Sequence, residues 1–179
     1  MLVMHGGSAF IETMHHQIQA LAKNHRVIAP DSRGHGRSSD SAAAISYLQM
    51  AEDMRELLSQ LEISKVDIVG WSDGGNIGLF MAREDPTLVN HLVKIGSNYH
   101  FSGFDYSYSG LAPDSETFES SKMVYEWLSP EPSHWLVFFE KVMGMWQTEP
   151  TLQAADLAVV QAKTMIMAGE FDAILTEHT

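Results

Sequence analysis

Residues 66–79 constrain the fold more than any other stretch, because a short apolar run there passes through a glycine turn directly into a helical pattern. The turn at residues 70–74 reads Gly-Trp-Ser-Asp-Gly. Between a strand and a helix, a Gly-x-Ser-x-Gly turn holds its serine in a strained backbone conformation with the hydroxyl exposed. A side chain at Gly70 or Gly74 would collide with so tight a turn. The stretch therefore predicts a nucleophile elbow, with Ser72 as the nucleophile.

Short apolar runs alternate with stretches of helical period through the first hundred residues. Apolar side chains recur at helical spacing at Met14, Ile18 and Leu21. A longer helix can start at Ser41, and another is expected over residues 75–83. The runs typical of strands buried on both faces are residues 2–4, 26–29, 66–69 and 92–95, and strand character returns at residues 164–168. This alternation predicts a mainly parallel α/β sheet of about five strands with right-handed crossovers.

The loop after the first expected strand reads His5-Gly6-Gly7-Ser8. Glycines in such a loop let backbone N–H groups point toward a developing oxyanion. Gly7 is the expected donor from this loop, and Asp73, the residue after the nucleophile, is the expected second donor. His5 is interpreted as a structural histidine that hydrogen-bonds the loop rather than as a catalytic base.

Residues 27–39, Val-Ile-Ala-Pro-Asp-Ser-Arg-Gly-His-Gly-Arg-Ser-Ser, complete a set of motifs that resembles the α/β-hydrolase fold. With the His-Gly-Gly loop and the elbow in the same order, the resemblance covers residues 2–98. The Trp-Ser-Asp elbow is similar to that of the valacyclovirase-like branch of small esterases. In such a loop Asp31, Arg33 and His35 are expected to be structural.

The same resemblance implies a sheet in the family's strand order 4-3-5-6-7, without the family's first two strands and its last. It implies that the chain is truncated at both ends, is completed by a partner subunit, or is a remnant that no longer catalyses. These three hypotheses stay open at this stage, although loss at both ends favours a fragment.

The resemblance also implies a catalytic acid after the strand that follows a cap segment, and the sequence Gly-Glu-Phe-Asp, ending at Asp172, occupies that place. Asp172 would orient the catalytic histidine and stabilise its imidazolium, and Asp105 is the alternative acid. The family's histidine follows one further strand, which has no counterpart here. Neither His178 nor His100 nor His134 fits that position, so the source of the base is left open.

Residues 101–162 have no buried-strand pattern and are expected to form a helical cap, between a core at residues 1–100 and a return to the core at residues 163–179. This segment holds 11 of the 17 aromatic residues, and 9 acidic against 2 basic side chains. Its aromatic residues can wall an apolar pocket, and its carboxylates disfavour an anionic ester. The expected pocket residues are Trp71, Tyr99, Phe101, Trp127 and Trp135, within a wider aromatic set that includes Phe104, Tyr106, Tyr108, Phe138, Phe139 and Trp146.

Composition excludes several classes of function. Without cysteine, the chain can form neither a disulfide framework nor a thiolate metal site, and it has no cysteine nucleophile. A net charge of −12 with no long basic run argues against binding to nucleic acid or to an anionic membrane. No apolar stretch reaches the length of a membrane span and no basic signal region precedes the first strand, so a cytoplasmic location is expected.

Together these features predict a serine hydrolase that cleaves a small carboxylic ester, or a related acyl compound, through an acyl-enzyme. No metal or organic cofactor is expected, and the expected partner is a small ester-like molecule. Exposed sheet edges could pair two copies of the chain into a homo-oligomer. The alternative hypothesis is a non-catalytic fragment or ligand-binding remnant that lacks the catalytic histidine.

Overall fold

A computed structural model of the protein describes residues 1–105 and 115–179, and the expected aromatic residues Tyr106 and Tyr108 lie outside the described residues. Over the described ranges the strands are β1 (Leu2–Met4), β2 (Val66–Trp71), β3 (Val89–Ile95) and β4 (Lys163–Met167). The α-helices are α1 (His15–Leu21), α2 (Tyr47–Gln60), α3 (Asp73–Glu84), α4 (Glu116–Leu128), α5 (Trp135–Thr148) and α6 (Ala154–Leu157). Single 3₁₀ turns occur at Ile11–Met14, Phe101–Gly103, Pro132–His134 and Thr176–His178.

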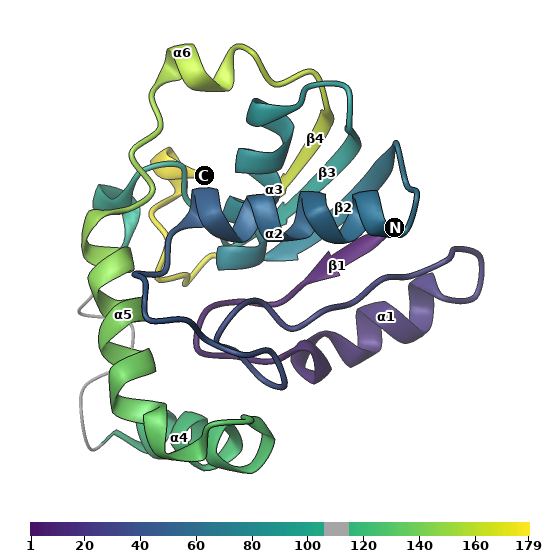
Figure 1. Ribbon diagram of the computed structural model, residues 1–179. Coiled ribbons are helices and arrows are strands. Elements are labelled where there is room, and N and C mark those ends of the chain that lie inside the picture. The colour runs from purple at the N-terminus through teal and green to yellow at the C-terminus, as the bar shows by residue number, and fades with distance from the viewer. Residues whose placement is uncertain (106–114) are drawn as a thin grey trace.

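The strands form one parallel sheet in the order β1-β2-β3-β4, which confirms the predicted fold class. Helices α2 and α3 lie on one side of the sheet, and α5 lies beyond the carboxyl ends of the strands (Figure 1). In register across the sheet, Val69 of β2 pairs with Val3 on one side and Val93 on the other. The carboxyl ends of all four strands therefore meet at one edge, where the elbow and the glycine loop also lie.

The fifth predicted strand, residues 26–29, is reduced to a single parallel bridge between Ile28 and Leu2. The Val3 N–H donates to the Ile28 carbonyl and the Ile28 N–H to the Met1 carbonyl, each at 2.9 Å. The segment thus takes its expected place beside β1, but its pairing is too short to count as a strand.

Helix α2 begins at Tyr47, so the predicted start at Ser41 is wrong. Ser46 has an extended backbone, and its hydroxyl accepts a hydrogen bond from the Gln49 N–H at 3.2 Å. This side-chain acceptor satisfies one of the free N–H groups at the helix start, as an N-cap residue does. The next residue, Tyr47, donates its N–H to the Glu149 carboxylate at 2.9 Å, so a contact with the distant segment after α5 also lies at the helix start.

Apolar side chains from the strands and from α2 and α3 share one core. Residues of this core that are at most 3% exposed include Leu2, Met4, Met50, Met54, Leu58, Ile68, Ile77, Met81 and Leu92. Because α3 lies directly on the sheet and α2 packs on α3, the helix that leaves the elbow is buried along most of its length. Burial of the helix keeps its first residue in one place at the sheet edge.

Helices α4 and α5 pack on each other through aromatic rings. The ring of Trp135 lies 5.4 Å from those of Phe118 and Tyr125 and 5.3 Å from that of Phe139. An ion pair of 2.6 Å between Lys141 of α5 and Asp40 joins this helical pair to the loop before α2. Both side chains are largely buried, so the contact is screened less by solvent than a surface pair.

Strand β4 lies at the open edge of the described sheet, and all five of its residues are exposed. Met165, Ile166 and Met167 are 59%, 52% and 48% exposed. An apolar edge strand of this kind offers unpaired backbone groups to any other strand.

Among the described residues, no helix combines the length and the apolar character that crossing a membrane requires.

Replacing Leu92 by alanine should lower the free energy of unfolding by about 2–5 kcal/mol, because it empties a fully buried position in the core. The matched control is Leu136→Ala at a position 64% exposed, which should change stability by less than about 0.5 kcal/mol. Urea denaturation followed by circular dichroism measures both. Equal losses in the two variants would contradict the described core.

Candidate active site

Ser72 lies between β2 and α3 with a backbone φ of +51° and ψ of −118°. Positive φ is rare for a residue with a side chain and occurs at sites where the surrounding structure enforces strain. The Ser72 N–H donates to the Ile95 carbonyl at 2.8 Å, which ties the turn to β3. A Cβ at Gly74 would lie 2.5 Å from the Met4 carbonyl oxygen, and one at Gly70 would collide with the backbone of Gly74. The turn has the geometry expected of an elbow.

The His-Gly-Gly loop lies directly against this turn. A Cβ at Gly6 would lie 3.2 Å from the Cβ of Ser72, and one at Gly7 would overlap the side chains of Asp73 and Trp146. Asp73 is the first residue of α3, so its N–H has no partner within the helix. The structure thus brings Gly7 and Asp73, the two predicted oxyanion donors, side by side next to Ser72.

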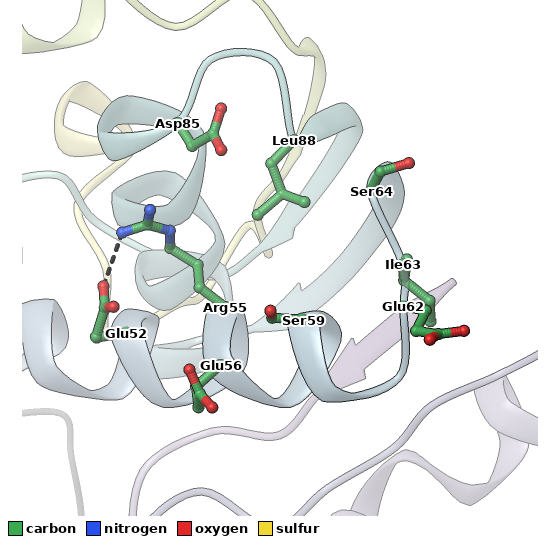
Figure 2. A pocket seen from close by; sticks show the side chains of 9 residues that line it. All are labelled: Glu52, Arg55, Glu56, Ser59, Glu62, Ile63, Ser64, Asp85 and Leu88. Atoms are coloured by element: carbon green, nitrogen blue, oxygen red, sulfur yellow. Dashed lines mark hydrogen bonds and ion pairs between the residues drawn. The ribbon is translucent and has the colours of Figure 1, made fainter.

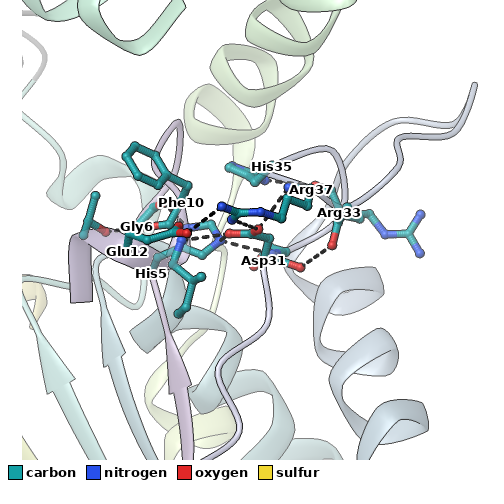
Figure 3. Close-up of polar contacts among 12 residues, drawn as sticks. His5, Gly6, Phe10, Glu12, Asp31, Arg33, His35 and Arg37 are labelled. Atoms are coloured by element: carbon teal, nitrogen blue, oxygen red, sulfur yellow. Dashed lines mark hydrogen bonds and ion pairs between the residues drawn. The ribbon is translucent and has the colours of Figure 1, made fainter. Parts of the chain in front are cut away.

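Two buried histidines hold the glycine loop in place (Figure 3). His5 donates from Nδ1 to the Gly6 carbonyl at 2.7 Å, and its Nε2 accepts from the Ser32 N–H at 3.0 Å. His35 donates from Nδ1 to the Arg33 carbonyl at 2.9 Å and accepts from the Ser8 N–H at 3.2 Å. Each ring uses one nitrogen as donor and one as acceptor, which requires the neutral form.

Burial lowers the pKa of both rings, that of His35 to about 3. A histidine that stays neutral and has both nitrogens bonded to backbone cannot serve as the base for Ser72. This geometry agrees with the structural role expected for His5 and His35.

Asp31 and Arg33 also bond within these loops. Asp31 accepts from the Ile11 N–H at 2.8 Å and the Arg37 N–H at 3.0 Å, so one carboxylate joins the segment after β1 to the loop after residues 26–29. Arg33 pairs with Asp53 of α2 through two hydrogen bonds of 2.5 Å. Both side chains are engaged in holding loops and helix together.

Asp172 lies in the loop after β4, at the same edge of the sheet as Ser72. Its two oxygens accept from the Ile174 N–H at 3.1 Å and the Gly169 N–H at 3.3 Å. A Cβ at Gly96, the residue after β3, would lie 2.9 Å from the Asp172 Oδ2. The carboxylate therefore sits at the end of β3, the strand next to the one that carries Ser72.

Within the described residues, no histidine hydrogen-bonds Ser72 or Asp172. The three histidines left open by the sequence make other contacts. They are His100, bonded to the Ser102 Oγ at 2.8 Å, His134, paired with Glu131 at 2.9 Å, and His178, whose ring lies 5.5 Å from that of Tyr99. In this part of the chain the site holds a serine, two candidate oxyanion donors and a carboxylate, and no base.

A small cavity opens beside Ser72. Its other lining residues come from five separate parts of the chain: Tyr47, Asp73, Asn98, Phe104, Trp146, Glu149 and Ile174. The Tyr47 hydroxyl donates to the Asp73 Oδ1 at 2.7 Å, and the Trp146 Nε1–H donates to Oδ2 at 2.9 Å. Asp73 is 5% exposed, and burial raises its pKa to about 6. The cavity therefore has a polar side built around Asp73 and an aromatic side built around Trp146.

Sequence reasoning did not find Tyr47, Asn98, Glu149 or Ile174. No local pattern marks them, since each reaches the cavity through the packing of a different segment. Asn98, for example, is placed by accepting a hydrogen bond from the Asn76 side chain at 3.0 Å and donating one to the His100 carbonyl at 2.8 Å.

The five expected pocket aromatics lie elsewhere. Alternation along β2 turns Trp71 to the sheet face opposite α3, where it lines a hollow with Met14 and Ile95. Trp127 is 80% exposed, and Trp135, 2% exposed, belongs to the aromatic core of α4 and α5. The remaining two, Tyr99 and Phe101, are half-buried; the Tyr99 carbonyl accepts from the Leu152 N–H at 3.0 Å, and the Phe101 ring stacks on His100 at 4.6 Å.

A larger hollow lies between α2 and the loop that joins α3 to β3, and it shares no residue with the cavity beside Ser72 (Figure 2). Acidic side chains dominate it, with one ion pair of 2.7 Å between Arg55 and Glu52. In the described part of the chain, no group of three or more histidine or carboxylate side chains is arranged to hold a metal ion.

The sequence matches a family model and is similar to known hydrolases, which agrees with the geometry of the site. A family model described as alpha/beta hydrolase fold matches residues 1–120. A soluble epoxide hydrolase from a Corynebacterium species is 35% identical over 92 residues, which cover 51% of this chain and 32% of that protein. A serine hydrolase from Mus musculus is 26% identical over 170 residues, covering 89% of this chain and 58% of that protein. The chain thus spans about a third to somewhat over half the length of these two relatives.

Solved structures show the same fold. The chain superposes on a carboxylesterase from Nitrososphaera gargenis with a TM-score of 0.73 at 22% identity, covering 99% of this chain and 74% of that one. An alpha/beta hydrolase enzyme from a Medee basin deep-sea metagenome library gives a TM-score of 0.75 at 18% identity, with the same coverage. At these identities the likeness concerns the fold alone.

The buried neutral His35 predicts that stability falls as the pH drops below about 6.5. The unfolded chain binds a proton at this residue near pH 6.5, but the folded protein does so only near pH 3, so the unfolded state holds more protons in between. The loss should reach at most about 1.4 kcal/mol per pH unit for one histidine. Urea midpoints at pH 7.5, 6.5 and 5.5 measure it.

His35→Gln should make this decline with pH shallower, whereas His25→Gln, at an exposed position, should leave it unchanged. An undiminished slope in the His35 variant would show that its ring titrates normally in the folded protein.

Proposed function

Since the chain belongs to the α/β-hydrolase fold family, we propose that it is a serine hydrolase in which Ser72 attacks the carbonyl carbon of a small carboxylic ester. The observation that carries the proposal is the strained Ser72, half-buried at the sheet edge, with Gly6 packed against it and Gly7 packed against the next residue, Asp73. A serine held in this way presents its hydroxyl to a substrate carbonyl, and N–H groups beside it can stabilise the oxyanion.

In the proposed reaction the Ser72 oxygen bonds to the carbonyl carbon while its proton passes to a base. The N–H groups of Gly7 and Asp73 donate to the resulting oxyanion. The base returns the proton to the departing alcohol, and the acyl group stays on Ser72 until water, deprotonated by the same base, releases it as the acid. Asp172 would orient a histidine base; the described residues supply none.

The proposed substrate is a neutral or cationic ester rather than an anionic one. Two carboxylate side chains, Asp73 and Glu149, line the cavity beside Ser72, and like charges repel in a site of low dielectric. Serine at the elbow argues against the chemistry named for the epoxide hydrolase relative, because in this fold that reaction uses a carboxylate nucleophile. Residues 101–162 are proposed to cap the site, since α5 contributes Trp146 to the cavity wall.

One observation favours the alternative function, a non-catalytic ligand-binding chain. Within the described residues neither Ser72 nor Asp172 contacts a histidine, and a serine hydroxyl without a base is a weak nucleophile near neutral pH. This alternative predicts that small ligands bind beside Ser72 and that none is turned over.

A fluorophosphonate probe should label the protein at Ser72. The serine oxygen displaces fluoride from phosphorus, and this phosphonylation needs the same activated hydroxyl as ester hydrolysis. Mass spectrometry of the labelled peptide locates the adduct. Ser72→Ala should abolish labelling, and Ser120→Ala, an exposed serine on α4, should leave it intact. Absence of labelling in the folded wild-type protein would favour the non-catalytic alternative.

A further inference from the structure

We propose that Asp73 is a positioning residue whose carboxylate holds the indole of Trp146 against the oxyanion loop, and that Trp146 thereby limits the size of the acyl group that reaches Ser72. The inference rests on the proposed function, because it concerns the substrate of that same site. It assigns to Asp73 a side-chain role separate from its backbone N–H.

The contacts of Trp146 place its ring at the centre of the site. Its Nε1–H lies 2.9 Å and 3.0 Å from the two oxygens of Asp73. The edge of the ring occupies the space that a side chain at Gly7 would need, so the indole lies directly on the backbone of the oxyanion loop. Its other side stacks on Phe104 with centroids 5.9 Å apart. Trp146 therefore fills the space next to the predicted oxyanion donor.

The end of α5 is held at a second point, three residues further on. Glu149 accepts a hydrogen bond from the Tyr47 N–H at 2.9 Å, and the Tyr47 hydroxyl donates to the Asp73 Oδ1 at 2.7 Å. Tyr47, the first residue of α2, thus contacts both Asp73 and the segment that carries Trp146. The elbow, the start of α2 and the end of α5 form one connected unit around the cavity.

A buried carboxylate at this position lowers the free energy of unfolding. A residue that costs stability in this way is expected to serve the site instead. Asp73 bonds to a hydroxyl and an indole, both uncharged, and no described lysine or arginine forms an ion pair with it. Burying a carboxylate without a cation is unfavourable, and burial raises its pKa to about 6. Perturbed ionisable groups of this kind gather at functional sites. Asparagine would cost less to bury, but it has a single acceptor oxygen, whereas Asp73 uses both of its oxygens.

The consequence concerns substrate size. The aromatic side of the cavity consists of Trp146, Phe104 and Ile174, and Trp146 is the member that a specific hydrogen bond fixes in place. With the indole fixed beside Gly7 the cavity next to Ser72 is small, so we expect it to accept only a short acyl chain. Removing the indole would open the cavity toward α5 and admit a longer one.

The size limit is tested with two fluorophosphonates, one carrying a methyl and one an octyl chain on phosphorus. Wild-type protein should react faster with the methyl probe. Trp146→Ala should raise the ratio of octyl to methyl labelling rates at least tenfold, because the wall is gone. The control Trp127→Ala, at an 80% exposed position, should leave the ratio unchanged. A ratio that does not move in Trp146→Ala overturns the proposed size limit.

The positioning role is tested without any reaction, by NMR of the indole N–H groups. The protein has four tryptophans, and the Trp146 signal is the one that Trp146→Phe removes. Asp73→Asn should shift this signal and speed its hydrogen exchange at least tenfold. Tyr47→Phe removes the other donor to Asp73 and should shift the Trp146 indole signal without speeding its hydrogen exchange. The control Trp127→Phe should leave the Trp146 signal unchanged.

An unchanged Trp146 signal in a folded Asp73→Asn protein overturns the positioning role. If wild-type protein reacts with neither probe, the proposed function and the size limit both fail, and the NMR result alone still decides whether Asp73 holds Trp146. If labelling occurs and only the indole signal fails to respond, the proposed function stands and the positioning role is overturned.

Discussion

Close contact between two backbone segments organises this protein. The elbow between β2 and α3 and the loop after β1 approach so tightly that a side chain at Gly7 or Gly74 would overlap atoms of the other segment. This contact seats the buried helix α3 on the sheet and places Ser72 at the edge where the strand ends meet. The positions of Gly7, Asp73 and Trp146 around Ser72 all depend on it.

The loops at this edge are held by buried polar groups as well as by packing of His35 against Phe138. His5 and His35 each bond to backbone through both ring nitrogens. Asp31 accepts from Ile11 in the segment after β1 and from Arg37 in the loop after residues 26–29. Groups of this kind fix one geometry, because any rearrangement would leave a buried polar atom without a partner. The same interactions make the loops sensitive to acid, since burial lowers the pKa of both histidines.

Strands and the elbow were predictable because their signals are local. A short apolar run such as residues 2–4 or 66–69 predicts a buried strand from its own residues alone. In the same way, the glycines flanking Ser72 predict a tight turn. Two local signals were not enough. Ser41 was predicted to start α2, which instead begins after Ser46, and residues 26–29 have the composition of a strand although only Ile28 pairs with β1. In both cases the choice depends on what the segment packs against.

By itself, the sequence determined the parallel α/β sheet and the strand-turn-helix context of Ser72, since periodicity and glycine spacing act over a few neighbouring residues. The order of the strands followed only from the resemblance to the α/β-hydrolase fold. The tertiary structure decided which side chains surround that serine. Tyr47, Trp146 and Glu149 come together across about a hundred residues of chain, while Trp71, Trp127 and Trp135 lie away from the cavity. The direction of a side chain depends on strand alternation, helix rotation and the packing of whole elements, which no single stretch of sequence specifies.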